Sequence, residues 1–563
     1  MEEYLREQIK KVLAGWPEVP GDFEPELETP NNPDHGDLAT NAALQLARHL
    51  RRSPRQIAEE LRNKLTELPL NPERVAAVEV AGAGFLNFRF SDDYLFRELA
   101  DLLAAGSEFG RRRRTGRTAI VEYVSANPTG PLTVGHGRNA VLGDTIANLL
   151  DWSGFAVTRE YYFNDAGRQM RVLGLSVRAR YEQLLRPGIA TKTIEGAGGA
   201  AVKVPESFPE DGYLGEYIID IARELKRARG DGLLEEGHPD LFKEAAEQAM
   251  FRQIEATLQR LGIRMDTFFN EQSLYEDKRV WEVLGQLRDA GYVYDADGAV
   301  WFRASALGRD QDKVLVKSSG EPTYRLPDIA YHVDKLHRGF DVAVDIFGAD
   351  HIATYPDVLA ALEVLGLDAS RVKVVIHQFV TLVRGGEPVK MSTRKAAYET
   401  LDDLLDEVGE DVTRFFFLMR SPNAHLEFDL DLAKESSEKN PVFYLQYAHA
   451  RICAILRKAE EVGFSFGSAP DLSLLTHDAE IGLIKTMLRL PSAIDEAGRL
   501  FEPHRLAVYL REVAVAFTQF YGHCRIIGEE REVATARMHL ALAARTVLAN
   551  GLAVLGISAP ERM

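Results

Sequence analysis

Apolar residues in the middle of the chain form short unbroken runs that alternate with stretches of helical spacing. The first run is TAIVEYV at 118–124, and a helical pattern follows it as far as Gly154. The apolar members of that pattern are Val141, Leu142, Ile146, Leu149 and Leu150. Similar runs at 157–163, 342–347 and 372–376 each enter a polar or glycine-bearing turn. Strands alternating with helices predict an α/β domain with a Rossmann-like, doubly wound parallel sheet, and ligands are expected at the carboxyl ends of its strands.

The first 110 residues have a mixed pattern that predicts a separate α+β domain. Ser53 and Pro54 are typical of a helix cap and first helical position, and VEVAGAGFLNFRF at 78–90 indicates strands broken by Gly-Ala-Gly. Four consecutive arginines at 111–114 mark the end of this domain. They fit either a solvated linker or an RNA contact.

Two further segments complete the predicted organisation. Residues 174–265 are mostly charged, with helical spacing and a glycine-rich interruption at 196–201, which indicates a helical insertion in the sheet domain. After Asp429 the strand pattern ends. Asn440 and Pro441 then predict the start of a helix, which has Phe443, Tyr447, Ala450 and Ala454 on one face. We therefore expect an N-terminal domain at 1–112, a sheet domain at 113–428 and a C-terminal all-α domain at 429–563.

Composition narrows the setting of the protein. The 563 residues carry a formal net charge of −18, so any RNA binding must be confined to local basic surfaces. Cys453 and Cys524 lie 71 positions apart (524 minus 453), which indicates a reducing, cytoplasmic compartment and no structural zinc. The charged N-terminus does not resemble a signal peptide. The most apolar stretch, 540–557, contains Arg545 and Asn550, so we expect a buried helix and no membrane span.

The stretch 122–144, EYVSANPTGPLTVGHGRNAVLGD, is the first that carries chemistry. A buried strand passes through a Pro/Gly-rich loop into a helix, and the free N–H groups of such a helix start bind phosphate. Gly135 would allow an adenine ring to approach the backbone, and His136 could donate a hydrogen bond to the α-phosphate of ATP. Taken alone, the Gly-His pair also fits a structural turn.

The second stretch is KMSTRK at 390–395, with three cations and two hydroxyls in six positions. Such a loop can clamp triphosphate oxygens as pyrophosphate leaves, although an isolated charge run also fits a solvated surface. As a pair in this order around an α/β sheet, the two stretches resemble the HIGH and KMSKS signatures of class I aminoacyl-tRNA synthetases.

Further segments of the sequence resemble the arginyl-tRNA synthetases within that class. The matching segments are SANPTGPL, YRLPDIAYHVDKL, GADH, NPVFYLQYAHARI and, near the N-terminus, HGDLATNAALQLA and GAGFLNFRF. The resemblance implies that L-arginine reacts with ATP, as its Mg²⁺ complex, to give arginyl-adenylate, and that arginine is then transferred to the terminal adenosine of tRNA(Arg). It also implies an N-terminal tRNA-binding domain and a C-terminal anticodon-binding domain. We expect a monomer.

Arginine selection requires carboxylates, because the planar guanidinium pairs best with carboxylate oxygens. Glu122 and Asn127 follow the first strand, and Tyr324 and Asp328 are four positions apart, which places them on one helix face. By resemblance, the arginine-binding set is Glu122, Asn127, Glu271, Tyr324, Asp328, Asp350 and His351. The set that binds ATP or acts in catalysis is Thr133, Gly135, His136, Lys390, Met391, Ser392, Arg394 and Lys395. In the helical tail, tRNA would meet Tyr444, Gln446, Tyr447, His449 and Arg451.

Two positions depart from the signatures. Thr133 stands where HIGH has its first histidine, and Thr393 stands where KMSKS has its second lysine. These departures leave open a non-catalytic, tRNA-binding paralogue of the family. A synthetase for another amino acid is a second alternative, although the absence of zinc-ligand spacing disfavours the cysteine enzyme. The helical tail disfavours a small-molecule nucleotidylyltransferase.

Overall fold

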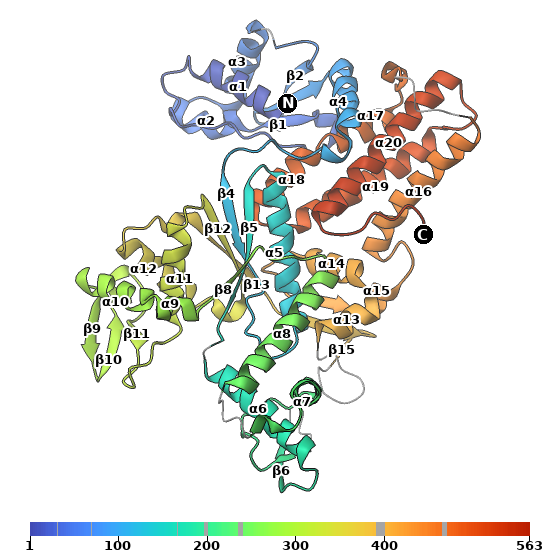
Figure 1. Cartoon of the computed structure of the whole chain (residues 1–563). Helices are drawn as coiled ribbons and strands as arrows, with labels where there is room; N and C mark the ends of the chain where they lie inside the picture. Colours follow the sequence, from blue (N-terminus) through green and yellow to red (C-terminus); the bar gives the residue numbers. More distant parts are fainter. Residues whose placement is uncertain are drawn as a thin grey trace.

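The computed structural model comprises three parts arranged around a central sheet (Figure 1). It describes all residues except 31, 69, 166, 196–200, 235–239, 390–399 and 464–469. The N-terminal part lies above the sheet in this view, the helical C-terminal part lies to its right, and an insertion extends below. The α+β, parallel α/β and all-α parts confirm the fold class predicted from the sequence.

The N-terminal part packs helices on a small antiparallel sheet of order β1-β3-β2. Ser53 caps α3 by accepting a hydrogen bond from the Gln56 amide, and Pro54 is the first helical residue, as predicted. Ile57, Leu61 and Leu65 are fully buried in the core of this domain. Its elements are α1 (Glu2–Leu13), β1 (Leu38–Thr40), α2 (Ala42–Leu50), α3 (Pro54–Glu67), β2 (Val75–Ala81), β3 (Phe85–Phe90) and α4 (Asp92–Ala105).

The central sheet has five strands in the order β13-β12-β4-β5-β8, and every pair is parallel. The four predicted strands are all present. The sequence analysis missed the edge strand β8 because its four residues are too short for a recognisable pattern. The strands are β4 (Thr118–Glu122), β5 (Ala156–Phe163), β8 (Thr267–Asn270), β12 (Val342–Gly348) and β13 (Val372–His377).

Alternate residues of β4 point to opposite faces of the sheet. Ala119 and Val121 belong to the core that contains α5 (Val134–Trp152), whereas Ile120 belongs to the core that contains α11 (Arg325–His337). Helices therefore cover both faces, as a doubly wound sheet requires. A Cβ at Gly143 of α5 would lie 2.2 Å from the ring of Tyr123, so glycine at this position lets α5 approach the strand closely.

The insertion after β5 is not purely helical, and that prediction was wrong in part. Between the helices lies a hairpin of β6 (Thr191–Glu195) and β7 (Ala201–Pro205), on either side of part of the glycine-rich interruption. Exposed and half-buried residues alternate along β6, but five residues give too weak a period to separate from the surrounding charged helices. The helices are α6 (Arg168–Leu185), α7 (Glu216–Arg229) and α8 (Leu241–Arg260).

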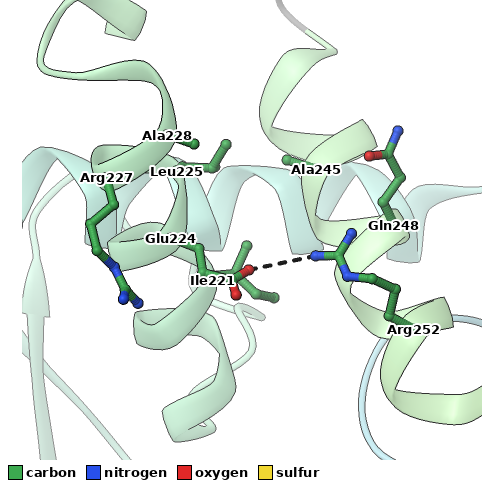
Figure 2. Close-up of a pocket in the computed structure, with 8 residues that line it drawn as sticks. All are labelled: Ile221, Glu224, Leu225, Arg227, Ala228, Ala245, Gln248 and Arg252. Carbon is green, nitrogen blue, oxygen red and sulfur yellow. Dashed lines mark hydrogen bonds and ion pairs between the residues drawn. The ribbon is translucent and has the colours of Figure 1, made fainter. Parts of the chain in front are cut away.

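A groove of about 460 Å³ lies between α7 and α8 (Figure 2). Arg252 reaches across it toward Glu224, with 3.5 Å between the guanidinium and the carboxylate. None of the described residues proposed for catalysis or binding lines this groove.

A second insertion lies between β8 and α11, and the sequence analysis did not identify it. It consists of α9 (Gln272–Glu276), α10 (Arg279–Asp289) and an antiparallel sheet of β9 (Val293–Ala296), β10 (Ala299–Phe302) and β11 (Lys313–Val316). Its core joins that of α11 and α12 (Tyr355–Val364) on one face of the central sheet.

The chain then forms a small sheet and the helical C-terminal part. The last strand ends at Asp429, as expected, and Asn440 caps α16 with Pro441 at its first position. Of the face named from the sequence, Tyr447 and Ala454 are exposed, Phe443 is half-buried and Ala450 is buried, so this face lies at the edge of the core. The elements are β14 (Val380–Arg384), β15 (Glu387–Pro388), α13 (Leu401–Val408), α14 (Glu410–Leu418), β16 (Leu426–Asp429), α15 (Leu430–Lys434), α16 (Pro441–Glu461), α17 (Asp478–Met487), α18 (Leu490–Leu500), α19 (His504–His523) and α20 (Arg531–Val554).

The apolar stretch at 540–557 lies mostly in α20 and is largely buried, as predicted. Among the described residues, no helix is both long and apolar enough to cross a membrane.

Three of the four arginines at 111–114 form ion pairs with other parts of the protein. Arg111 and Arg114 each lie within 2.7 Å of the Asp151 carboxylate, and Arg112 lies 2.7 Å from Asp495 of α18. These ion pairs connect the domain boundary to α5 and to the helical part. The sequence analysis had proposed a solvated linker or an RNA contact, and neither includes such contacts within the protein.

Candidate active site

The predicted amino-acid and nucleotide residues that the structure describes lie at or just after the carboxyl ends of the central strands, or at the starts of the helices beside them. Glu122 is the last residue of β4 and Asn127 lies just beyond it, Glu271 follows β8, and Asp350 follows β12. His136 lies in the first turn of α5. The parallel sheet therefore gathers at one edge residues that are more than 200 positions apart in the sequence.

Thr133 and His136 form a reciprocal cap at the start of α5. The Thr133 hydroxyl accepts from the His136 backbone amide at 3.4 Å, and Nδ1 of His136 accepts from the Thr133 backbone amide at 3.1 Å. Burial lowers the pKa of His136, which favours the neutral ring. With Nδ1 accepting, the proton of that neutral ring is on Nε2, where it is available as a donor.

The second signature, which contains Lys390, Met391, Ser392, Arg394 and Lys395, lies outside the described residues. Its flanks are described. The Val389 amide donates to Leu382 of β14 at 2.8 Å, and the Leu401 amide donates to the Leu132 carbonyl at 2.7 Å. Leu132 directly precedes Thr133, so the chain re-enters the described structure beside the first signature.

A chain of amide groups joins Asn127 to Glu271. Oδ1 of Asn127 accepts from the Asn164 backbone amide at 3.1 Å, and Nδ2 of Asn164 donates to Glu271 at 2.7 Å. The Tyr162 hydroxyl donates to the other oxygen of Glu271 at 2.5 Å. Glu271 is only 7% exposed. Among the described residues, no lysine, arginine or histidine forms an ion pair with it. It is therefore a buried carboxylate held by neutral donors.

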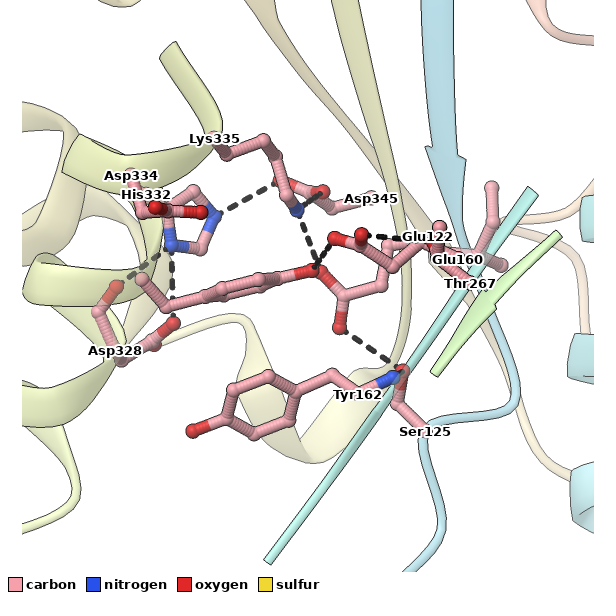
Figure 3. A network of polar contacts seen from close by, with 12 residues as sticks. Glu122, Ser125, Glu160, Tyr162, Thr267, Asp328, His332, Asp334, Lys335 and Asp345 are labelled. Carbon is pink, nitrogen blue, oxygen red and sulfur yellow. Dashed lines mark hydrogen bonds and ion pairs between the residues drawn. The ribbon is translucent and has the colours of Figure 1, made fainter. Parts of the chain in front are cut away.

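A second chain, of alternating charge, leads from Asp328 to Glu122 (Figure 3). Nδ1 of His332 lies 2.8 Å from the Asp328 carbonyl oxygen and 3.1 Å from the Asp328 carboxylate, and its Nε2 lies 3.0 Å from Asp345. The Lys335 ammonium donates to both Asp345 and Glu122 at 2.6 Å. Asp328 is the exposed end of the chain, with 35% of its side chain accessible, whereas the groups behind it are buried.

The charges of this chain support one another. Burial alone would lower the pKa of His332, but the carboxylates of Asp345 and Asp328 outweigh it and raise that pKa to about 10. Burial would also lower the pKa of Lys335, yet Asp345 and Glu122 raise it. The pKa of Asp345 is lowered despite burial because two cations face it, whereas burial dominates at Glu122, which faces Lys335, and raises its pKa.

The structure places the remaining predicted arginine contacts differently. Glu122 is 3% exposed, and its oxygens accept from Lys335 and Ser125, so direct contact with a substrate would require these bonds to open. Tyr324 precedes α11 and is 86% exposed. Asp350 and His351 are also exposed, 3.6 Å apart, and the His351 ring stacks on Phe347. Roles for these residues remain predictions.

The predicted RNA-binding residues of α16 fall into two groups. Gln446 and His449 are buried and hold the C-terminal segment, through Ser558 and the Pro560 carbonyl. Tyr447 is exposed and stacks on Phe443, and the Arg451 guanidinium lies over the ring of Tyr521 on α19. Tyr444 is half-buried. An RNA contact is therefore easier to place at Tyr447 and Arg451 than at the buried pair.

The sequence analysis missed five residues that shape this site: Tyr162, Asn164, His332, Lys335 and Asp345. His332 could have been found, because it lies four positions after Asp328 and one helical turn brings such residues together. Tyr162 and Asn164 could not, because their role depends on β8, which was not predicted.

Models of protein families match three consecutive segments of the chain. "Arginyl tRNA synthetase N terminal domain" matches residues 2–90, "tRNA synthetases class I (R), catalytic domain" matches 98–420, and "DALR anticodon binding domain" matches 445–563.

Curated relatives agree along the full length. An arginine–tRNA ligase of Salinibacter ruber is 62% identical over 564 residues, which cover 100% of both chains. The chain belongs to the arginine–tRNA ligase family. An arginine–tRNA ligase of Pelodictyon phaeoclathratiforme is 48% identical over 575 residues, again covering 100% of both chains. The solved arginyl-tRNA synthetase of Thermus thermophilus has the same fold, with a TM-score of 0.78, 24% identity and complete coverage of both chains.

Proposed function

We propose that this protein is an arginine–tRNA ligase that activates L-arginine with ATP and transfers it to the 3′ adenosine of tRNA(Arg). The observation that carries the proposal is the full-length match to an arginine–tRNA ligase at 62% identity, with all three parts of the chain matching family models. Within the site, Glu271 is buried and Asp328 is partly exposed. The charge of Asp328 adds to burial in raising the pKa of Glu271, although Tyr162 and Asn164 donate to Glu271 and oppose the rise. Two neighbouring carboxylates favour a bound cation, and a guanidinium supplies both the charge and paired donors.

In the proposed first step, a carboxylate oxygen of arginine attacks the α-phosphorus of ATP. The bond from that phosphorus to the oxygen bridging the α- and β-phosphates breaks, and pyrophosphate leaves as its Mg²⁺ complex. Nε2–H of His136 would donate to the α-phosphate, while Gly135 leaves room for the nucleotide. Because no covalent intermediate with the protein is required, positioning and electrostatic stabilisation would supply the catalysis.

Lys390, Arg394 and Lys395 would contact the leaving pyrophosphate. The support for this is the Leu401–Leu132 hydrogen bond, which brings one flank of that segment beside the first signature.

In the second step, a hydroxyl of the terminal adenosine of tRNA attacks the carbonyl carbon of the adenylate and releases AMP. The family match of the helical part supports tRNA docking there, and we propose a cytoplasmic, monomeric enzyme.

The proposal is tested by ATP–pyrophosphate exchange with purified protein, arginine, Mg²⁺ and tRNA(Arg). Radioactivity from labelled pyrophosphate should enter ATP only when arginine is present. The alternative of a tRNA-binding paralogue without catalysis is motivated by Thr133 and Thr393, and it predicts tRNA binding with no exchange. The reciprocal cap favours the enzyme, because threonine at this position orients His136 rather than leaving the helix start uncapped.

A further inference from the structure

The chain turns sharply at the end of β4, at two residues that are not glycine. Val124 has φ +68° and Ser125 has φ +44°, and in the described part of the chain these are the only two consecutive non-glycine residues with positive φ. A β-branched residue in this conformation is a strong outlier, because its side chain crowds the backbone. Such a turn persists only where surrounding contacts hold it.

The side chain of Asn139, on α5, supplies that contact. Its Oδ1 accepts from the Val124 amide at 2.6 Å, and its Nδ2 donates to the Ile346 carbonyl at 2.8 Å. Nδ2 also lies 3.3 Å from Nε2 of His377. Burial lowers the pKa of His377 to about 4, so the ring is neutral at neutral pH and Nε2 can accept. Asn139 therefore joins α5 to the carboxyl ends of β4, β12 and β13.

The Val124–Ser125 turn fixes the positions of the proposed arginine contacts. Ser125 Oγ donates to Glu122 at 3.0 Å and accepts from the Tyr162 amide at 3.2 Å. Two residues further on, Asn127 accepts from the Asn164 amide, and Asn164 donates to Glu271. A turn that relaxed at Val124 would shift both Asn127 and the amide that holds Glu271.

We propose that Asn139 is a positioning residue for arginine: it holds the Val124–Ser125 turn in its left-handed conformation and so keeps Asn127 and Glu271 in place. The inference rests on the proposed function. Its specific consequence is that the need for Asn139 depends on the conformational preference of residue 124. Glycine adopts positive φ without crowding, so a glycine there would make Asn139 less necessary.

The test measures KM for arginine and for ATP in pyrophosphate exchange with tRNA(Arg) present. Asn139→Ala should lower kcat/KM for arginine by about ten- to a hundred-fold, as a small misplacement of contacts does, while KM for ATP stays within about two-fold of wild type. Val124→Gly in the Asn139→Ala background should recover a large part of that loss. Val124→Ala is the matched control, since it also shortens the side chain but keeps the Cβ, and it should recover much less than glycine does.

Asn139→Asp keeps an oxygen for the Val124 amide and should lose less arginine affinity than Asn139→Ala, which gives a second measurement if the alanine variant folds poorly. The inference is overturned if Asn139→Ala leaves KM for arginine unchanged, or if glycine and alanine at 124 give the same result. Wild-type protein without arginine-dependent exchange would instead overturn the proposed function.

Discussion

His332 holds the carboxylate of Asp328, with 3.1 Å between its Nδ1 and Oδ1 of Asp328. The ring itself is anchored from behind, where Nε2 meets the buried Asp345, which also accepts from Lys335. The buried charges of His332, Asp345 and Lys335 thus hold the partly exposed Asp328 carboxylate in one orientation. A substrate cation at Asp328 would meet a group that is already oriented, which reduces the entropy lost on binding.

Replacing His332 should therefore weaken arginine binding without touching the nucleotide. His332→Gln removes the cation behind Asp328, and we expect KM for arginine to rise about ten- to a hundred-fold, a typical cost of a misplaced contact. KM for ATP should hold. His337→Gln is the matched control, because it makes the same change at an exposed position of the same helix. Equal effects of the two variants would contradict this role.

The raised pKa of His332 also predicts a pH dependence of stability. Its folded value is about 10, and an unperturbed histidine has a pKa of about 6.5. Folding therefore favours the protonated ring, so this contribution is complete below pH ~6.5 and is lost as pH rises through ~10. The difference in Tm between wild type and His332→Gln should be largest near pH 6 and should shrink toward pH 10. A Tm difference that stays constant from pH 6 to pH 10 would refute the raised pKa of His332.

Asp328 itself should be the most sensitive residue for arginine. Removing one side of a desolvated charge pair costs roughly 2–5 kcal/mol, so Asp328→Asn should lower kcat/KM for arginine by about thirty-fold to several thousand-fold. The variant keeps the size of the side chain and one acceptor, so the fold should survive. Asp334→Asn provides the control, since Asp334 is on the same helix but pairs with Arg279 and Arg338. Near wild-type charging by Asp328→Asn would show that the proposed pocket is misplaced.

Thr133 should matter for the nucleotide rather than for arginine. Thr133→Val keeps the shape but removes the oxygen that caps α5, which costs about 0.5–2 kcal/mol of stability for an N-cap. It also frees His136, so KM for ATP should rise while KM for arginine is retained. Thr133→Ser preserves the hydroxyl and should behave as wild type. If valine left both Tm and KM for ATP unchanged, the reciprocal cap would have no functional weight.

The sequence predicted those features that follow from local chemistry. Ser53 and Asn440 start their helices as expected because caps act within one turn. The buried strands β4, β5, β12 and β13 were recognisable from continuous apolar runs. Strand β8 and the sheet of the second insertion were missed because four-residue strands carry almost no period.

The candidate site was predictable by residue type but not by geometry. Asp328 and Glu271 were proposed from resemblance, and their partners at the sheet edge depend on the order of the strands. Glu122 illustrates the limit: its place at the end of β4 was correctly predicted, but its burial against Lys335 depends on a lysine 213 positions away. No local pattern contains that contact.

The most direct test of the account is aminoacylation of tRNA(Arg) by the purified protein with each of the twenty amino acids in turn, in the presence of ATP and Mg²⁺. The account predicts that arginine is attached and that lysine, which carries the same charge without the planar fork, is attached at most at a trace level. Attachment of another amino acid at a comparable rate, or no attachment of arginine at all, would contradict it.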